Sequence, residues 1–168
     1  GRRNATFVIP EDIALLDKVS GAMTRVARVT KPSVVSIQTS TPQGRTRIEH
    51  AFGSGVIFDT RGHIITSCHV VEGATQITVT LSDRREFSAK VVGTDPKTDL
   101  AVVKIEAKDL QSLKWAEYEK LQVGDLVLAV GSPFGLSSTV TLGIISALGR
   151  GNVGIADYED FIQTDAAI

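Results

Sequence analysis

The sequence predicts an all-β protein with an N-terminal helix, in which a first small β-barrel is followed by the beginning of a second. Short β-branched segments separated by turn residues fill residues 33–106, the pattern of a small closed barrel. Glycine is frequent (15 residues) and aromatic residues are few (5%), as in turn-rich β proteins. Helical periodicity, with apolar residues every three or four positions, is confined to the N-terminal region.

Bulk properties exclude several classes of function. The 168 residues carry a formal net charge of −1, so no basic surface for binding nucleic acid is expected. No apolar run approaches the roughly eighteen residues of a membrane span. The N-terminus has no apolar signal core, so we expect any targeting segment to be removed or to lie outside this sequence. The single cysteine, Cys68, allows no internal disulfide.

The first 32 residues are expected to form an arm and a helix. Residues 1–10 are mostly polar, but Phe7–Ile9 are apolar and should dock on this chain or on a neighbouring subunit. A helix is predicted over 11–29, because acidic residues begin it and Pro32 follows it. Gly21 weakens the middle of this helix, so the sequence is compatible with one continuous helix or with two shorter ones. We expect its apolar face to pack on a barrel.

The remaining elements follow from alternation and turn residues. The first barrel (33–106) is expected to contain six strands, at 34–39, 53–58, 63–66, 76–81, 86–92 and 100–105. A polar loop is expected over 41–50, and residues 107–120 are expected to be a linker with Trp115 as a packing anchor. The second barrel begins in 121–168, with strands at 126–131, 139–148 and 161–164 and a loop over 149–160.

His69 is the first candidate for chemistry, because the small residues Ser67 and Cys68 bring it to a strand end. An imidazole titrates near neutral pH and can both take and give a proton. Asp99 precedes a later strand, and at the same barrel rim its carboxylate could accept a hydrogen bond from His69. A lone histidine is more often structural, and Asp99 reads equally well as an ordinary turn carboxylate.

Several segments occur together in a specific order. They are Gly53–Ile57 with Ile65–Val71, then Thr98–Val102, Gly131–Leu136, Gly143–Arg150 and Phe161–Ile168. With these segments the sequence resembles the HtrA/DegP/DegQ family of trypsin-like serine proteases from about Val34 to Ile168. The resemblance implies two perpendicular β-barrels, trypsin-like (chymotrypsin) in fold, with the active site in the cleft between them. His69 matches the general base of the family and Asp99 its orienting carboxylate.

The family pattern continues into a Gly-Asn-Ser-Gly-Gly element that carries the nucleophile and the oxyanion-hole amides. This sequence stops shortly before that serine, so the second barrel is expected to be incomplete and the 168-residue chain alone to be inactive. The resemblance places Ala167 and Ile168 at the wall of the S1 pocket, which implies small aliphatic P1 residues. It matches Arg150 to a sensor loop, although a merely solvated arginine is an equal alternative.

The resemblance also implies a biological setting. It implies ATP-independent degradation of unfolded or misfolded proteins in the periplasm or cell envelope, as part of stress response and protein quality control. It implies trimers or higher oligomers formed through the N-terminal arm, chaperone-like behaviour, and PDZ domains in the full-length protein. No cofactor and no metal are expected.

Other readings of the same residues are weaker. Ser54 lacks the spacing of a nucleophile elbow, and Ser132 precedes a proline and looks like turn chemistry. A Cys68–His69 dyad is disfavoured, because neighbours along a strand point to opposite faces. A metal site needs His63, Cys68, His69 and Glu72 to converge, and their spacing matches no familiar zinc pattern. A non-catalytic peptide-binding barrel or an inactive protease fragment remains the alternative function.

Overall fold

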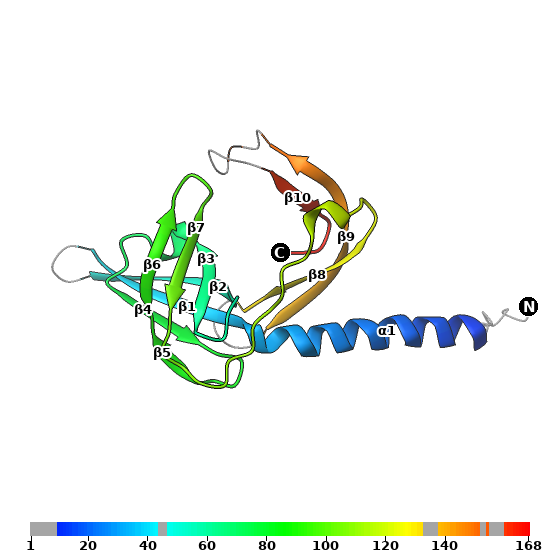
Figure 1. The fold of residues 1–168 in the computed structure, drawn as a ribbon, viewed down its shortest axis with the longest axis horizontal. Helices are drawn as coiled ribbons and strands as arrows, with labels where there is room; N and C mark the ends of the chain where they lie inside the picture. Colours follow the sequence, from blue (N-terminus) through cyan, green and yellow to red (C-terminus); the bar gives the residue numbers. More distant parts are fainter. Residues whose placement is uncertain (1–9, 44–46, 133–137, 152–153, 155–159) are drawn as a thin grey trace, which may run out of the picture.

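The structure is a computed structural model that describes residues 10–43, 47–132, 138–151, 154 and 160–168. One long helix precedes two antiparallel sheets, which confirms the predicted all-β class with an N-terminal helix (Figure 1). The elements are α1 (Pro10–Thr30), η1 (Lys31–Ser33), β1 (Val34–Gln43), β2 (Arg47–Ile57), β3 (His63–Ser67), α2 (Cys68–Val71), β4 (Gln76–Thr80), β5 (Glu86–Ser88), β6 (Lys90–Asp95), β7 (Leu100–Lys104), η2 (Tyr118–Lys120), β8 (Leu126–Gly131), β9 (Thr139–Arg150) and β10 (Phe161–Thr164).

The first sheet has seven strands in the order β5-β4-β1-β2-β3-β7-β6. Its two edge strands, β5 and β6, follow one another in the chain and are separated by Ala89 alone. The backbone N–H of Ala89 donates to the carbonyl of Ile77 on β4. The expected strand over 86–92 is therefore two short strands. Because one residue joins the two edges, the sheet curls round and encloses its own core.

The core of the curled sheet is aliphatic, as the alternation of the sequence predicts. On β1, Val35, Ile37 and Thr39 are spaced two residues apart and are at most 2% exposed. The other fully buried aliphatic side chains of this core are Ile57, Ile64, Val79, Val103 and Ile105. Their burial makes this sheet a rigid base for the short segments at its rim.

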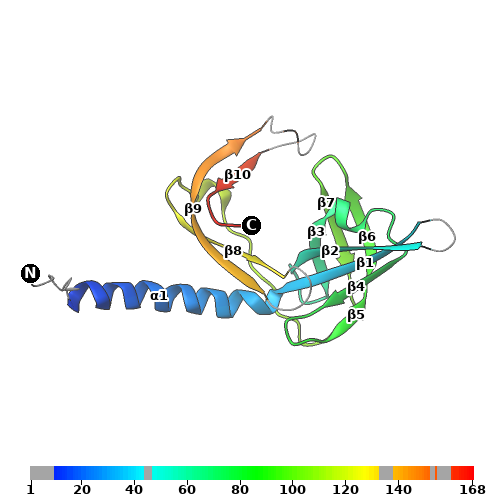
Figure 2. The same cartoon turned by 180° about the vertical axis from the view of Figure 1, so that it is seen from behind.

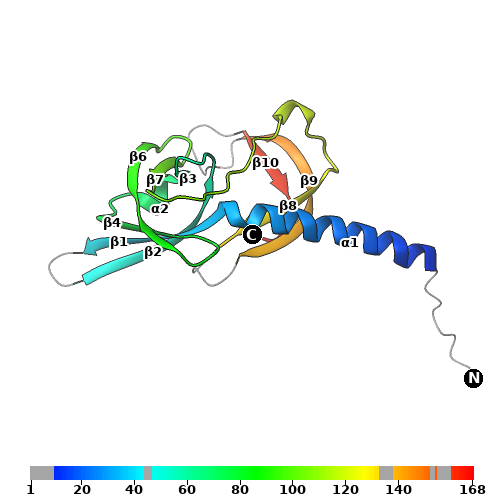
Figure 3. The ribbon, with the colours of Figure 1, turned by 60° about the horizontal axis from the view of Figure 1, so that its bottom comes forward.

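The polar stretch over 41–50, expected to be a loop, instead belongs largely to a long hairpin. β1 runs on to Gln43 and pairs antiparallel with β2 all the way to Arg47. The ends of these strands project from the sheet in Figure 3, and Glu49 and His50 are exposed. With no core on either side, these residues need not alternate between apolar and polar, so the sequence carries no strand signal there.

The helix α1 departs from expectation in its surroundings. It is continuous through Gly21 and contacts β8 near its C-terminal end, but its N-terminal part extends beyond both sheets (Figures 1 and 2). Most of its large apolar side chains are exposed: Ile13, Leu15, Leu16, Val19, Val26 and Val29. The arm residues Phe7–Ile9 lie outside the described residues. In the part of the chain that the structure describes, no helix combines the length and the apolar character of a membrane span.

The second sheet is smaller, with three strands in the order β10-β9-β8. Two of them, β8 and β10, have the predicted bounds, and β9 extends two residues beyond its prediction. This sheet stands beside the seven-stranded one, with the C-terminal residues between them (Figure 1). Trp115, expected to anchor the linker, is 74% exposed and anchors nothing. The open three-stranded sheet agrees with an incomplete second barrel.

Candidate active site

His69 lies on α2, a single helical turn of four residues at the rim of the curled sheet. This corrects the expected strand end, because β3 stops at Ser67 and the chain turns into a helix at Cys68. The helical turn sends neighbouring side chains in different directions: Cys68 is 5% exposed, whereas the side chain of His69 is 69% exposed. His69 is therefore presented to solvent while its neighbours hold the turn to the core.

Asp99 lies in the turn between β6 and β7, and its backbone is hydrogen-bonded to the first residue of α2. Its carbonyl accepts the N–H of Cys68 at 2.9 Å, and its own N–H donates to the carbonyl of Pro96. Asp99 has φ +54°, a left-handed conformation that aspartate tolerates better than most residues. The turn thus directs the side chain of Asp99 along the start of α2.

The two predicted residues are in direct contact. Oδ2 of Asp99 lies 2.7 Å from Nδ1 of His69, and Oδ1 accepts the backbone N–H of His69 at 2.9 Å. The first N–H groups of a helix have no partner within it, and Ser67 at the N-cap forms no side-chain cap bond. Asp99 supplies that cap from a distant turn and binds the imidazole with the same carboxylate.

The environment keeps Asp99 ionised. Partial burial of the carboxyl works to raise its pKa. The hydrogen bonds from the backbone N–H and the ring of His69, together with the charge of that ring, lower it by more. The pKa of Asp99 therefore lies below its ordinary value. An ionised acceptor at Nδ1 favours the tautomer with hydrogen on Nδ1 and leaves Nε2 free to accept a proton. This arrangement suits a general base.

Two further residues, Thr39 and Gly53, hold the other end of α2. The hydroxyl of Thr39 on β1 donates to the carbonyl of Val70 at 3.1 Å. The side chain of Val70 fills the space beside Gly53 on β2, where a Cβ would stand 2.7 Å from it. Thr39 looks like one more strand residue in the sequence, so only the fold reveals its contact with α2.

The other predicted site residues lie on the second sheet or in the segment that follows it. The carbonyl of Ala167 accepts the hydroxyl of Thr141 on β9 at 2.6 Å, and Ala167 and Ile168 are both exposed. Arg150, at the end of β9, donates from Nε to the side-chain oxygen of Gln163 on β10. The structure thus brings His69 and Asp99 together. It places Arg150 at the end of β9, and Ala167 and Ile168 in the segment that follows β10.

The two serines considered as nucleophiles are used structurally. The Oγ of Ser54 on β2 accepts the backbone N–H of Ser132 at 2.8 Å, which links the two sheets. The carbonyl of Ser54 accepts the hydroxyl of Thr66. Within the described residues, the ring of His69 has its hydrogen bond to Asp99 and none to a serine.

Cys68 does not form a dyad with His69. Burial raises the pKa of its thiol, and the negative charges of Glu72, Asp99 and Asp95 raise it further. A buried thiol of raised pKa is a poor nucleophile, because the thiolate is the reactive form. The sequence disfavours this dyad on the assumption that Cys68 and His69 are neighbours on a strand. In the structure the two residues lie on a helix, and the burial of Cys68 is what argues against the dyad.

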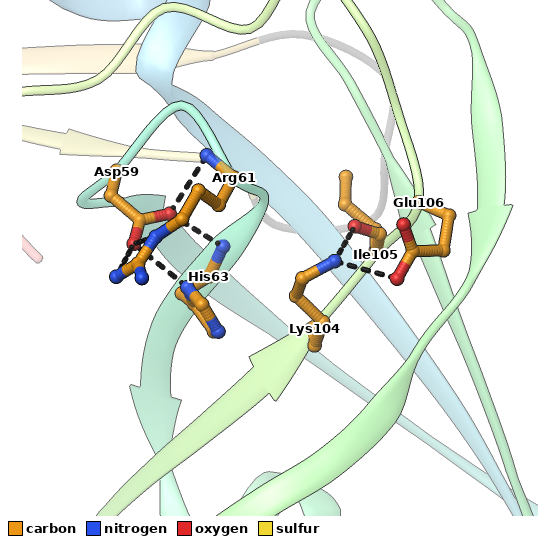
Figure 4. A network of polar contacts seen from close by, with 6 residues as sticks. All are labelled: Asp59, Arg61, His63, Lys104, Ile105 and Glu106. Atoms are coloured by element: carbon orange, nitrogen blue, oxygen red, sulfur yellow. Dashed lines mark hydrogen bonds and ion pairs between the residues drawn. The ribbon is translucent and has the colours of Figure 1, made fainter.

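The proposed metal ligands do not converge either. Nδ1 of His63 lies 2.7 Å from Asp59, whose carboxylate also binds the Arg61 side chain (Figure 4). In the same view, Lys104 donates to the carbonyl of Ile105 and to Glu106. The contacts of Asp59 with Arg61 and His63 brace the turn between β2 and β3. Among the described residues, no three His, Cys, Asp or Glu side chains are grouped to hold a metal ion.

Comparison with known proteins gives consistent results. Residues 53–168 match the trypsin-like peptidase domain family. A "Probable periplasmic serine endoprotease DegP-like" of Chlamydia muridarum (strain MoPn / Nigg) is 52% identical over 127 residues, which cover 76% of this chain. The "Periplasmic serine endoprotease DegP" of Escherichia coli (strain K12) is 53% identical over 120 residues, 70% of this chain. In both cases the match covers 25% of the relative, so the chain spans about a quarter of those proteins.

Solved structures agree with the sequence relatives. The structure titled "HtrA-type protease AlgW with tripeptide" is 45% identical and superposes with a TM-score of 0.80. That match covers 86% of this chain and 46% of the solved one.

Proposed function

Since this chain belongs to the HtrA/DegP family of trypsin-like serine proteases, we propose that it supplies the general base and the orienting carboxylate of a serine endopeptidase. The observation that carries the proposal is the double contact of Asp99 with His69, through Nδ1 and through the backbone N–H. The carboxylate fixes the ring in one orientation and one tautomer, which a base in acyl transfer requires.

In the proposed reaction, Nε2 of His69 takes the proton of a serine hydroxyl as that oxygen attacks the peptide carbonyl. His69 then returns the proton to the leaving amine, and Asp99 stabilises the imidazolium between the two steps. We propose that the serine and the oxyanion-hole amides are supplied by residues outside these 168. On that basis we propose that the 168-residue polypeptide by itself is inactive, because it would lack both the nucleophile and the oxyanion-hole amides.

The substrates we propose are unfolded or misfolded proteins, degraded without ATP. The two relatives described above are named periplasmic endoproteases, and we place this chain in the same compartment. With Ala167 and Ile168 at the S1 wall, no charge is offered to a basic side chain, so we propose small aliphatic P1 residues such as valine or alanine. A peptide-library profile with arginine or lysine preferred at P1 would overturn this.

The proposal extends to assembly and regulation. We propose a homotrimer or larger oligomer that involves the N-terminal arm, and PDZ domains in the complete protein. We propose that the chain divides into an arm and helix (1–32), a first barrel (33–106), a linker (107–120) and the start of a second barrel (121–168). Arg150 is proposed as a sensor that couples these contacts to an ordered oxyanion hole. If Arg150→Ala leaves activation of the complete protein unchanged, Arg150 has no sensor role.

The test uses the complete protein that contains this chain. It should be labelled covalently by a fluorophosphonate, and it should degrade a chemically unfolded protein in buffer without ATP. Labelled peptide mapping should locate the modified serine outside residues 1–168. Absence of labelling and of cleavage would instead favour the non-catalytic peptide-binding barrel.

A further inference from the structure

Helix α2 is too short to be stable on its own, so the position of His69 depends on what holds the helix. It has four residues, and isolated helices of even about 12 residues are marginal in water. At its start, Asp99 accepts the N–H groups of Cys68 and His69. A fixing point at one end alone would still allow the turn to pivot about Asp99.

The second fixing point is Thr39. Its hydroxyl donates to the carbonyl of Val70, which directly follows His69, and the Thr39 side chain is 2% exposed. Thr39 pairs with Ala51 on β2 and with Ile77 on β4, so it lies inside the sheet with a strand on each side. A donor held on such a strand has little freedom to follow α2 if the helix moves.

Gly53 sets the depth at which α2 sits. A Cβ at this position would stand 2.7 Å and 2.9 Å from the two methyl carbons of Val70, whose side chain is 6% exposed. Gly53 faces Ile37 in the β1–β2 ladder, so its backbone cannot move aside without disturbing that pairing. The absence of a side chain at 53 lets Val70 pack directly on β2.

We propose that Thr39 and Gly53 are positioning residues for His69, acting through Val70. Thr39 fixes the orientation of α2 and Gly53 fixes its distance from the sheet, so together they set where Nε2 stands. This inference rests on the proposed role of His69 as general base. Small displacements of a catalytic group can reduce the rate by as much as about 10²-fold, so loss of either contact should appear in kcat.

The first experiment replaces Thr39 in the complete protein. Thr39→Val keeps the shape and removes the donor, and kcat should fall about tenfold with KM close to that of the wild type. Thr39→Ser keeps the hydroxyl and should restore most of kcat. Thr66→Val is the matched control, because Thr66 is also buried (5% exposed) and donates to a main-chain carbonyl, that of Ser54 on β2. It should lower the melting temperature similarly and retain kcat.

A second readout does not depend on activity. The Nδ1–H proton of His69, hydrogen-bonded to Asp99, should give a downfield resonance in the wild type and in Thr39→Ser that is broadened or shifted in Thr39→Val. If the wild type shows no serine-dependent cleavage, the proposed function fails, yet this resonance still decides the positioning role. An unchanged resonance in Thr39→Val overturns the inference, and so does a loss of kcat in Thr66→Val equal to that in Thr39→Val.

The role of Gly53 is tested by a double-mutant cycle. Gly53→Ala should push Val70 outward, lower kcat and disturb the same resonance. In Gly53→Ala with Val70→Ala, the methyl groups that the new Cβ would meet are gone. The combined loss of kcat should therefore be smaller than the product of the two single losses. Losses that simply multiply would show that Gly53 does not act through Val70.

Discussion

Asp99 holds His69 at two places with one carboxylate: Oδ2 at 2.7 Å from the ring Nδ1 and Oδ1 at 2.9 Å from the backbone nitrogen. The same side chain therefore caps α2 and orients the imidazole. Its replacement should affect both the local helix and the chemistry, and a second Asp–His pair in the same sheet, Asp59–His63 at 2.7 Å, separates the two effects.

In the complete protein, Asp99→Asn should lower kcat by roughly 10⁴-fold, as removal of the charge does in a trypsin-type triad. The amide cannot stabilise the imidazolium and can favour the wrong tautomer. Asp59→Asn removes a carboxylate with the same distance to a histidine but no proposed catalytic role. It should retain kcat while lowering thermal stability. Equal kinetic losses in the two variants, measured with one peptide substrate, would contradict the account.

Acid should weaken the turn between β2 and β3 through Asp59. Burial of this carboxyl works to raise its pKa, but hydrogen bonds from His63 and Arg61 hold the pKa far below its ordinary value. A carboxylate with a lowered folded-state pKa stabilises the fold above its unfolded pKa of about 3.9, and the contribution is lost as pH falls further. The melting-temperature gap between wild type and Asp59→Asn should therefore shrink below about pH 4. A gap that stays constant with pH would rule out this linkage.

Substitution of two glycines with nearly equal φ angles should distinguish the cost of backbone strain from the cost of a steric clash. Gly62 has φ +95° and Gly124 has φ +99°, but a Cβ at Gly62 would run into the carbonyl of Ile105, whereas one at Gly124 meets nothing within 4 Å. Gly124→Ala should cost about 1–2 kcal/mol for the left-handed backbone alone. Gly62→Ala should cost roughly 3 kcal/mol or more, since the turn must also move off Ile105. Urea unfolding measures both, and equal costs would refute the steric argument.

The exposure of α1 has a consequence for stability. Leu16 on α1 is 65% exposed, whereas Ile37 on β1 is fully buried. Leu16→Ala should change the unfolding free energy of the chain by less than about 0.5 kcal/mol, while Ile37→Ala should lower it by about 2–5 kcal/mol. If the two substitutions destabilise the monomer equally, α1 packs on the sheets as its apolar periodicity suggested.

The sequence predicted the regular, half-buried strands well, because they obey a rule that can be read locally. β8 and β10 begin and end where short runs of apolar or β-branched residues and the neighbouring turn residues indicate. The rule fails where no core imposes it, as in the β1–β2 hairpin near His50. It also fails where a segment is barely longer than one helical turn, as in α2. It also gives no information on what an apolar helix face touches, so the exposure of most apolar side chains of α1 could not be foreseen.

The candidate site divides in the same way. His69 and Asp99 could be singled out because their residue types and flanking segments match a family pattern. Thr39 could not, because a threonine in a strand is ordinary and its partner, the carbonyl of Val70, is 31 residues away. For Trp115 the sequence suggested a role that the structure does not support. A large aromatic residue in a linker was expected to pack, but its side chain is exposed.

The most direct test compares two histidines of the complete protein on one unfolded protein substrate. His69→Ala should lower kcat/KM by up to roughly 10⁶-fold, as loss of the base does in serine proteases. His63→Ala, which removes a partner of Asp59 and the ring stacked on Phe58, should keep serine-dependent cleavage near the wild-type rate. Cleavage by His69→Ala at the wild-type rate would contradict the assignment of His69 as the base.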